Sequence, residues 1–201
     1  MKHALFGARA LALGMVVAGI LTAPAYAGQP VSVDTSWCTN PLLSQPFLSS
    51  GDSNMYALVP GQGAGGFDGT GWTLSGGAKI VTSTLADGTT GSVLDLPSGA
   101  AAISPTICVT SAYPTARMRV RDVAGSAGVS FYVSYDGTKT WKKPLNTGQV
   151  QGNGTAWTLA NPVDIEPSTT PGWQPVRFML QGGKKSESDV YALYVDPRMI
   201  R

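Results

Sequence analysis

The sequence predicts an all-β protein built as an antiparallel two-sheet β-sandwich. Three observations support this prediction. Short apolar runs alternate with turn residues, and Gly and Pro (25 and 14 residues) recur too often for long helices. After residue 27, no stretch of the sequence has the periodicity of an amphipathic helix. Runs spaced in this way are typical of sandwiches and barrels. The predicted strands are 56–59, 71–82, 92–96, 101–109, 116–123, 129–135, 140–145, 156–165, 176–181 and 190–195.

Three of these runs show which of their side chains face a core. In 116–121, Ala, Met and Val alternate with Arg117, Arg119 and Arg121, and apolar residues alternate with polar ones in much the same way in 129–135 and 176–181. Successive side chains of a strand point to opposite faces. Each strand therefore has one buried and one solvated face, as in a sandwich, whereas an all-parallel sheet is buried on both faces.

The first 27 residues have the features of a secretory signal peptide. Lys2 and Arg9 supply positive charge, residues 10–21 are apolar, and Ala25-Tyr26-Ala27 is a small-x-small cleavage site. A membrane span needs about 20 apolar residues, more than this run provides. We therefore expect cleavage after Ala27, a secreted chain without a membrane span, an irregular arm over 28–54 and a β-sandwich domain over 55–201.

Charge and composition exclude several functions for the secreted chain. Without Lys2 and Arg9 it carries twelve basic and twelve acidic residues, and a net charge of zero gives no electrostatic attraction to nucleic acid. The only histidine, His3, lies in the signal peptide, so histidine-based triads and the common zinc sites are excluded. A two-carboxylate glycosidase stays open, but Glu166 and Glu187 lie in loop-like surroundings that favour a non-catalytic protein.

Cys38 and Cys108 are the only two cysteines. In a secreted protein an even pair is most simply one disulfide, which would close a loop of about 70 residues. The alternative is two free thiols, one of them reactive.

The arginines of 116–121 suggest a ligand site. Arg117, Arg119 and Arg121 point to one face, where like charges repel, so an anionic partner would relieve them. The alternative is an ordinary solvated surface. In the functional interpretation, a glycan or an anionic cell-wall polymer binds a basic face composed of Arg117, Arg119, Arg121, Tyr132, Arg177 and Gln181.

Several segments resemble secreted carbohydrate-binding, galactose-binding-like jelly rolls. Phe67-Asp68-Gly69 with Gly71-Trp72 resembles the opening strand of that superfamily, and 91–96 (GSVLDL) and 191–198 (YALYVDPR) resemble its second and closing strands. Residues 55–198 also resemble small secreted actinobacterial β-sandwich proteins. The resemblance implies a jelly-roll fold with no cofactor except a structural calcium ion, for which Asp68 and Asp189 are the candidate ligands.

Three functions follow from these observations. The first is a secreted non-catalytic module that binds a glycan or cell-wall polymer. The second is a glycosidase or polysaccharide lyase on the same fold, and the third is a structural or protein-interaction module with no small ligand. Fold alone does not choose among them, and the oligomeric state stays open.

Overall fold

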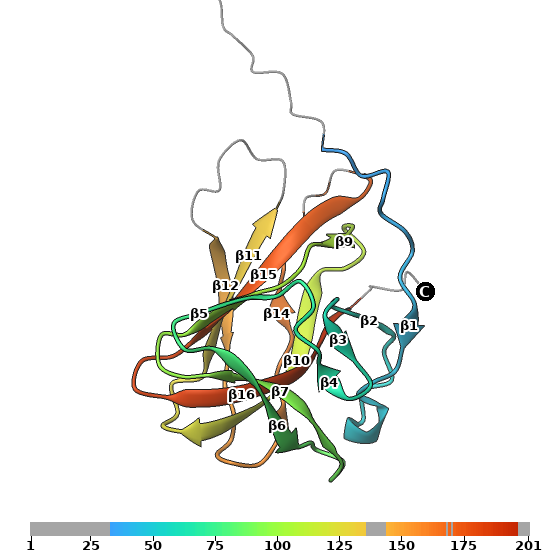
Figure 1. Ribbon diagram of the computed structural model, residues 1–201. Coiled ribbons are helices and arrows are strands. Elements are labelled where there is room, and N and C mark those ends of the chain that lie inside the picture. Colours follow the sequence, from blue (N-terminus) through green and yellow to red (C-terminus); the bar gives the residue numbers. More distant parts are fainter. Residues whose placement is uncertain (1–32, 136–143, 168, 170, 197–201) are drawn as a thin grey trace, which may run out of the picture. The chain divides into compact units, whose positions relative to one another are not determined.

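Two β-sheets enclose one apolar core (Figure 1). The computed structural model describes residues 33–135, 144–167, 169 and 171–196, all within one compact unit, Val31–Arg201. No α-helix occurs in these ranges, and the one helical element is a 3-10 turn, η1, at Leu48–Ser50. The prediction of an all-β protein built as a two-sheet sandwich is confirmed.

The larger sheet has ten strands. Its main path runs β1 (Leu43–Ser44), β2 (Tyr56–Leu58), β16 (Glu187–Asp196), β7 (Thr90–Leu96), β4 (Gly66–Phe67) and β3 (Gln62–Gly63). Beside this path, β10 (Thr115–Ala124) pairs with β16, β13 (Thr158–Leu159) and β14 (Val163–Asp164) pair with β10, and β6 (Lys79–Thr84) pairs with β7. All pairs are antiparallel except β4 with β7.

The smaller sheet has six strands. Its order is β12 (Leu145–Val150), β11 (Val129–Tyr135), β15 (Gln174–Gly182), β8 (Ala101–Ile103) and β5 (Thr73–Ser75), with β9 (Ile107–Val109) also paired to β15. Fully buried side chains of both sheets, among them Met118, Phe131, Phe178 and Leu193, belong to one core cluster. The alternation expected for 116–121 and 129–135 is therefore real, because every second side chain enters this core.

Three expected strands are interrupted. The run 71–82 divides at Gly76 and Gly77, whose φ angles of 64° and 93° make the turn that sends β5 and β6 to different sheets. The run 101–109 divides into β8 and β9 around Pro105, which cannot donate to a strand ladder. The run 156–165 divides into the short strands β13 and β14.

The expected arm over 28–54 is partly ordered into the sheet. Leu43 and Ser44 form β1 against β2, and Phe47 is fully buried between the rings of Tyr56 and Tyr194. This segment therefore covers part of the outer face of the ten-stranded sheet. The expected signal peptide over 1–27 and the first part of the run 140–145 lie outside the described residues.

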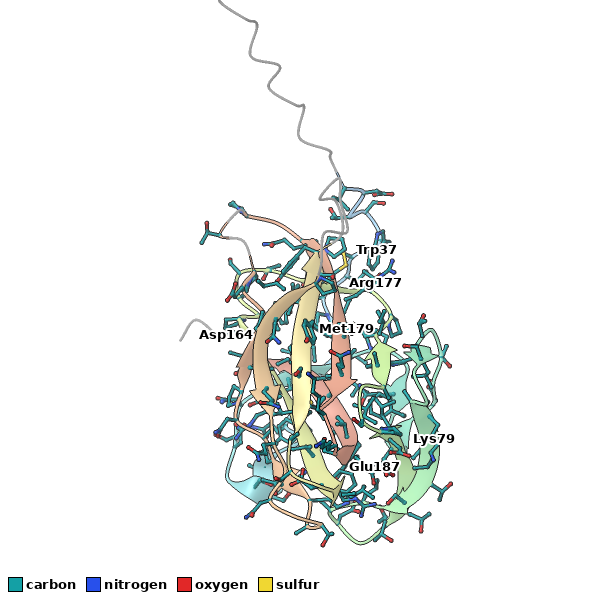
Figure 2. The ribbon with its side chains drawn as sticks, turned by 90° about the vertical axis from the view of Figure 1, so that its left-hand side faces the viewer. Trp37, Lys79, Asp164, Arg177, Met179 and Glu187 are labelled. Atoms are coloured by element: carbon teal, nitrogen blue, oxygen red, sulfur yellow. A yellow bond between two sulfur atoms is a disulfide. The ribbon has the colours of Figure 1, made fainter. Side chains whose placement is uncertain are left out.

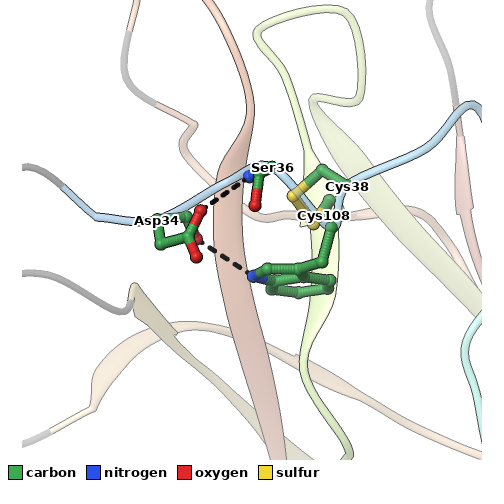
Figure 3. Close-up of a disulfide and its surroundings, with 5 residues drawn as sticks. Asp34, Ser36, Cys38 and Cys108 are labelled. Atoms are coloured by element: carbon green, nitrogen blue, oxygen red, sulfur yellow. Dashed lines mark hydrogen bonds between the residues drawn. A yellow bond between two sulfur atoms is a disulfide. The ribbon is translucent and has the colours of Figure 1, made fainter.

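A disulfide ties the arm to the sandwich, as one of the two interpretations of the cysteines predicts. Cys38 is bonded to Cys108 on β9, with the two Cα atoms 5.7 Å apart (Figure 3). Beside it, Asp34 accepts a 2.9 Å hydrogen bond from the backbone N–H of Ser36 and, through its carbonyl oxygen, a 3.0 Å bond from the Trp37 indole. The bridge closes a loop with a sequence separation of 70 residues.

The double variant Cys38→Ser/Cys108→Ser should be less stable than the wild-type protein by about 4 kcal/mol, because the open loop adds entropy to the unfolded chain. Urea denaturation of both proteins measures the difference in the free energy of unfolding. A loss below about 1 kcal/mol would show that the bridge does not restrict the unfolded chain in this way.

Candidate ligand-binding site

The three arginines of β10 lie on the outer face of the ten-stranded sheet, where two of them form ion pairs. Arg117 pairs with Asp52 and donates from Nε to the carbonyl oxygen of Ala160 at 2.8 Å. Arg121 donates from Nε and Nη2 to Asp189 Oδ2 at 2.9 and 2.6 Å. Carboxylates of the protein itself therefore relieve the repulsion along β10, so Arg117, Arg119 and Arg121 do not form the expected basic face.

The pKa values of Asp52 and Asp189 shift in opposite directions. Burial opposes ionisation of Asp52, but hydrogen bonds from Tyr56 and Asn54 and the charge of Arg117 outweigh it and hold the pKa of the Asp52 carboxyl below its usual range. Burial raises the pKa of Asp189, although the hydrogen bond and charge of Arg121 act against the rise. Arg121 is therefore the main group that favours the charged form of Asp189.

Arg119, between these two residues, has a different environment. Its Nη2 donates to Ser50 Oγ at 2.8 Å, and its guanidinium lies 5.7 Å from the centroid of the Phe47 ring. None of the ion pairs found among the described residues includes Arg119. Because guanidinium has five N–H donors, Arg119 keeps donors for a ligand.

A β-bulge in β16 brings two tyrosines to the face that carries Arg119. Arg117 lies opposite Tyr194, but Arg119 lies opposite Tyr191, so two residues of β16 share one position on β10. Ala192 at this bulge has a φ of 54°, in the left-handed region that bulges usually fill with glycine. The extra residue reverses the alternation of faces, and Tyr191 and Tyr194 both point outward.

The buried side chain of Gln62 holds this bulge. Its Oε1 accepts a 3.1 Å hydrogen bond from the backbone N–H of Leu193, and its Nε2 donates to the carbonyl oxygens of Leu193 and Val59, both at 3.1 Å. The amide thus satisfies backbone groups of Leu193 at the point where β16 departs from its register. A buried backbone group left without a partner would cost about 1–3 kcal/mol.

A cavity of about 580 Å³ opens over the bulge, within the size range of small-molecule sites. Arg119, Tyr191 and Tyr194 line it from the sheet, Ser49 and Ser50 from η1, and Asp87 from the turn after β6. The remaining lining comes from Pro46, Leu58, Gln62, Gly63, Ala64, Gly66, Leu85, Ala86 and Ala192. The N-terminal arm is therefore one wall of the cavity.

Asp87 supplies the acceptor of the cavity. Hydrogen bonds from the Thr89 hydroxyl and N–H, together with the charge of Arg119, hold the pKa of Asp87 below its usual range. Nearby, the backbone N–H of Ala86 donates to the hydroxyl oxygen of Tyr191 at 2.9 Å. A cationic donor and an anionic acceptor thus share one open cavity.

The sequence pointed to Arg119 but not to the other residues of this cavity. Gln62 lies in a glycine-rich stretch that predicts only a loop, and Asp87 lies in a turn that shows no pattern. For Tyr191 and Tyr194, regular alternation would place the two side chains on opposite faces. Only the bulge brings them together.

Tyr132, Arg177 and Gln181 do not join the arginines of β10, contrary to expectation. They lie on β11 and β15 of the six-stranded sheet, and Figure 2 shows Arg177 and Met179 on that sheet. Tyr132 donates from its hydroxyl to Gln181 Oε1 at 3.2 Å, and Arg177 donates from Nε to Thr106 Oγ1 at 2.9 Å. The expectation was wrong because equal alternation in two strands does not place them in one sheet.

The expected calcium ligands Asp68 and Asp189 have other partners. Asp68 Oδ1 accepts a 2.7 Å hydrogen bond from the N–H of Thr70 in a turn, and Asp189 holds Arg121. Across the described part of the chain, no three Asp, Glu, His or Cys side chains gather as a metal-binding group. Asp68 and Asp189 are therefore not part of a metal-binding group of the described residues.

Comparisons of the sequence with known proteins find no match. The sequence matches no protein-family model and no curated protein sequence. In the part of the chain that the structure describes, no helix is long and apolar enough to cross a membrane.

Solved structures of carbohydrate-binding modules are similar to this chain at low sequence identity. The CBM22-1 xylan-binding domain from Paenibacillus barcinonensis Xyn10C has a TM-score of 0.42 and 14% identity, over 65% of this chain and 88% of that domain. TmCBM61 in complex with β-1,4-galactotriose has a TM-score of 0.39 and 16% identity, over 66% and 94%. The family 11 carbohydrate-binding module from Clostridium thermocellum, in complex with a β-1,3-1,4-mixed-linked tetrasaccharide, has a TM-score of 0.37 and 11% identity, over 73% and 96%. Likenesses at this level assign no ligand to this chain.

Arg121→Ala should destabilise the protein by about 3–5 kcal/mol, because it leaves the buried Asp189 carboxylate without its counter-charge. Arg119→Ala should cost about 1 kcal/mol or less, since Arg119 has no ion pair among the described residues. Chemical denaturation of the two variants measures both values. Equal losses would contradict the distinction between a structural and an available arginine.

Proposed function

We propose that this protein is a secreted, non-catalytic module that binds an uncharged glycan in the cavity around Arg119. The observation that carries the proposal is the pairing of an available guanidinium with a carboxylate in one open cavity. Sugar hydroxyl groups both donate and accept hydrogen bonds, so a site for them needs acceptors as well as donors. Arg119 supplies donors, and Asp87 supplies an acceptor.

The charge of the cavity favours a neutral glycan over an anionic cell-wall polymer. Asp87 offsets the charge of Arg119, and the neighbouring Arg117 and Arg121 are neutralised by Asp52 and Asp189. An anionic ligand at Arg119 would share the cavity with the Asp87 carboxylate, and like charges disfavour such binding. The aromatic and aliphatic side chains of the lining, from Tyr191, Tyr194 and Leu58, suit the apolar faces of sugar rings.

The architecture of the site supports binding more than catalysis. Glycoside hydrolysis commonly needs two carboxyl groups on opposite sides of the scissile bond, and Asp87 is the one carboxylate among the described residues of the lining. The residues that shape the cavity are held by the Gln62 contacts and by the buried Phe47. Such a preformed site lowers the entropy cost of binding.

A glycan array that contains neutral and acidic oligosaccharides, probed with residues 28–201, tests this function. We expect neutral glycans to bind, and we expect Arg119→Ala and Asp87→Asn each to weaken the affinity at least about ten-fold in titration calorimetry, about 1.4 kcal/mol for each lost charged hydrogen bond. Tyr132→Phe is the matched control on the other sheet and should bind like the wild-type protein.

Three outcomes would refute the proposal. They are an array without any bound glycan, wild-type affinity in Arg119→Ala, and a loss of affinity in Tyr132→Phe that equals the loss in Arg119→Ala. Binding of acidic glycans alone would refute the neutral-ligand part and restore the anionic polymer as the ligand class.

A further inference from the structure

An exposed turn between β12 and β13 carries an asparagine followed by a glycine. Asn153 and Ala156 form an isolated antiparallel bridge, and the residues from 153 to 156 are all exposed. Gly154 has a φ of 70°, in the left-handed region that glycine adopts without steric cost. The sequence has five asparagines, and Asn153 is the only one that precedes a glycine.

The backbone nitrogen after an asparagine can convert the asparagine side chain into a carboxylate. The nitrogen loses its proton and attacks Cγ, the side-chain amide leaves as ammonia, and water opens the resulting succinimide to aspartate or isoaspartate. Glycine obstructs this attack least because it has no Cβ atom. Asn40 and Asn161 precede proline, which has no N–H to lose, and the two other asparagines precede methionine and threonine. Asn153 is therefore the asparagine of this chain most open to the reaction.

The nitrogen that would attack Asn153 is hydrogen-bonded to a buried carboxylate. The backbone N–H of Gly154 donates to Asp122 Oδ2 at 3.3 Å, and the backbone N–H of Asp122 donates to the carbonyl oxygen of Gly154 at 2.8 Å. Asp122 is 5% exposed, so its carboxylate contacts the exposed turn from below the surface. An amide that loses its proton keeps the electron pair along the former N–H direction. Here that direction points toward Asp122 Oδ2, and the carboxylate also repels a second negative charge on the nitrogen.

Two Asp-Gly pairs of the described residues, at 68–69 and 87–88, have the same arrangement with a different acceptor. In both, the glycine N–H donates to a backbone carbonyl oxygen, from Gly69 to Gly61 at 3.3 Å and from Gly88 to Leu85 at 3.1 Å. Substitution of a side chain leaves those carbonyl acceptors in place. At Gly154 the acceptor is a side chain, so a single substitution removes it.

We propose that Asn153 is a deamidation site and that the side chain of Asp122 protects it in the folded protein. The reaction then requires the turn to separate from Asp122, and such local opening occurs in a minority of the molecules. Either product disfavours closure of the turn, because aspartate adds a negative charge beside Asp122 and isoaspartate adds a carbon atom to the backbone. None of these residues lines the cavity around Arg119, so the proposal does not depend on the proposed function.

The rate of deamidation in the folded and the unfolded protein tests the site. Residues 28–201 are incubated in mildly alkaline buffer with and without guanidinium chloride, and peptide mapping by mass spectrometry follows the mass increase from –NH₂ to –OH. In guanidinium chloride, Asn153 should react before the other four asparagines. In the folded protein its rate should be at least about ten-fold lower, because opening must break a hydrogen bond to a carboxylate. Equal rates in the two states, or faster reaction at another asparagine, would overturn the proposal.

Three variants assign the protection to Asp122. Folded Asp122→Ala should lose most of the difference from the unfolded protein, and Asp122→Asn, which keeps the shape but not the charge, should also react faster than the wild-type protein. The matched control is Cys38→Ser/Cys108→Ser, which lowers stability but leaves the contact in place and should react at the wild-type rate. Asp122 variants as slow as the wild-type protein would contradict the assignment. An equal acceleration in the cysteine variant would show that general instability, rather than Asp122, sets the rate, and would contradict it as well.

Discussion

The contacts of the Gln62 amide with the backbone of Leu193 are the constraint on which the outer face of the ten-stranded sheet depends. They join residues 131 positions apart in the sequence and stabilise β16 where its register against β10 changes. That change turns Tyr191 and Tyr194 toward the side of Arg119, and the segment around the buried Phe47 then encloses the cavity. A bulge with alanine in a left-handed conformation is strained, and such strain persists where surrounding contacts maintain it.

The three arginines of β10 have different environments on the outer face of the ten-stranded sheet. Arg117 and Arg121 neutralise carboxylates that burial would otherwise make costly, whereas Arg119 rests on Phe47 and Ser50 and faces the cavity. Two arginines of one strand thus compensate buried carboxylates, and the third lies in the lining of the cavity.

The sequence was sufficient to predict the two layers and the inward faces of 116–121 and 129–135. For the cysteines it left a disulfide and two free thiols as alternatives, and the structure has the disulfide. These predictions succeeded because alternation along a strand is a local property, and the residues themselves record it. Which strands are neighbours is not local, so Tyr132 and Arg177 were placed wrongly beside the arginines. The bulge at Ala192 could not be predicted either, since alanine carries no signal for a left-handed conformation and Gln62 lies far away in the sequence.

The register of β10 against β16 is the most direct test of this architecture, and nuclear Overhauser contacts in the labelled protein measure it. The bulged pairing predicts interstrand contacts from Arg117 to Tyr194, from Arg119 to Tyr191 and from Arg121 to Asp189, with two residues of β16 opposite Met118. A ladder that continues without interruption from Arg117 and Tyr194 would instead bring Arg119 to Ala192 and Arg121 to Val190. That result would contradict the bulge, the shared face of the two tyrosines and the ion pair of Arg121.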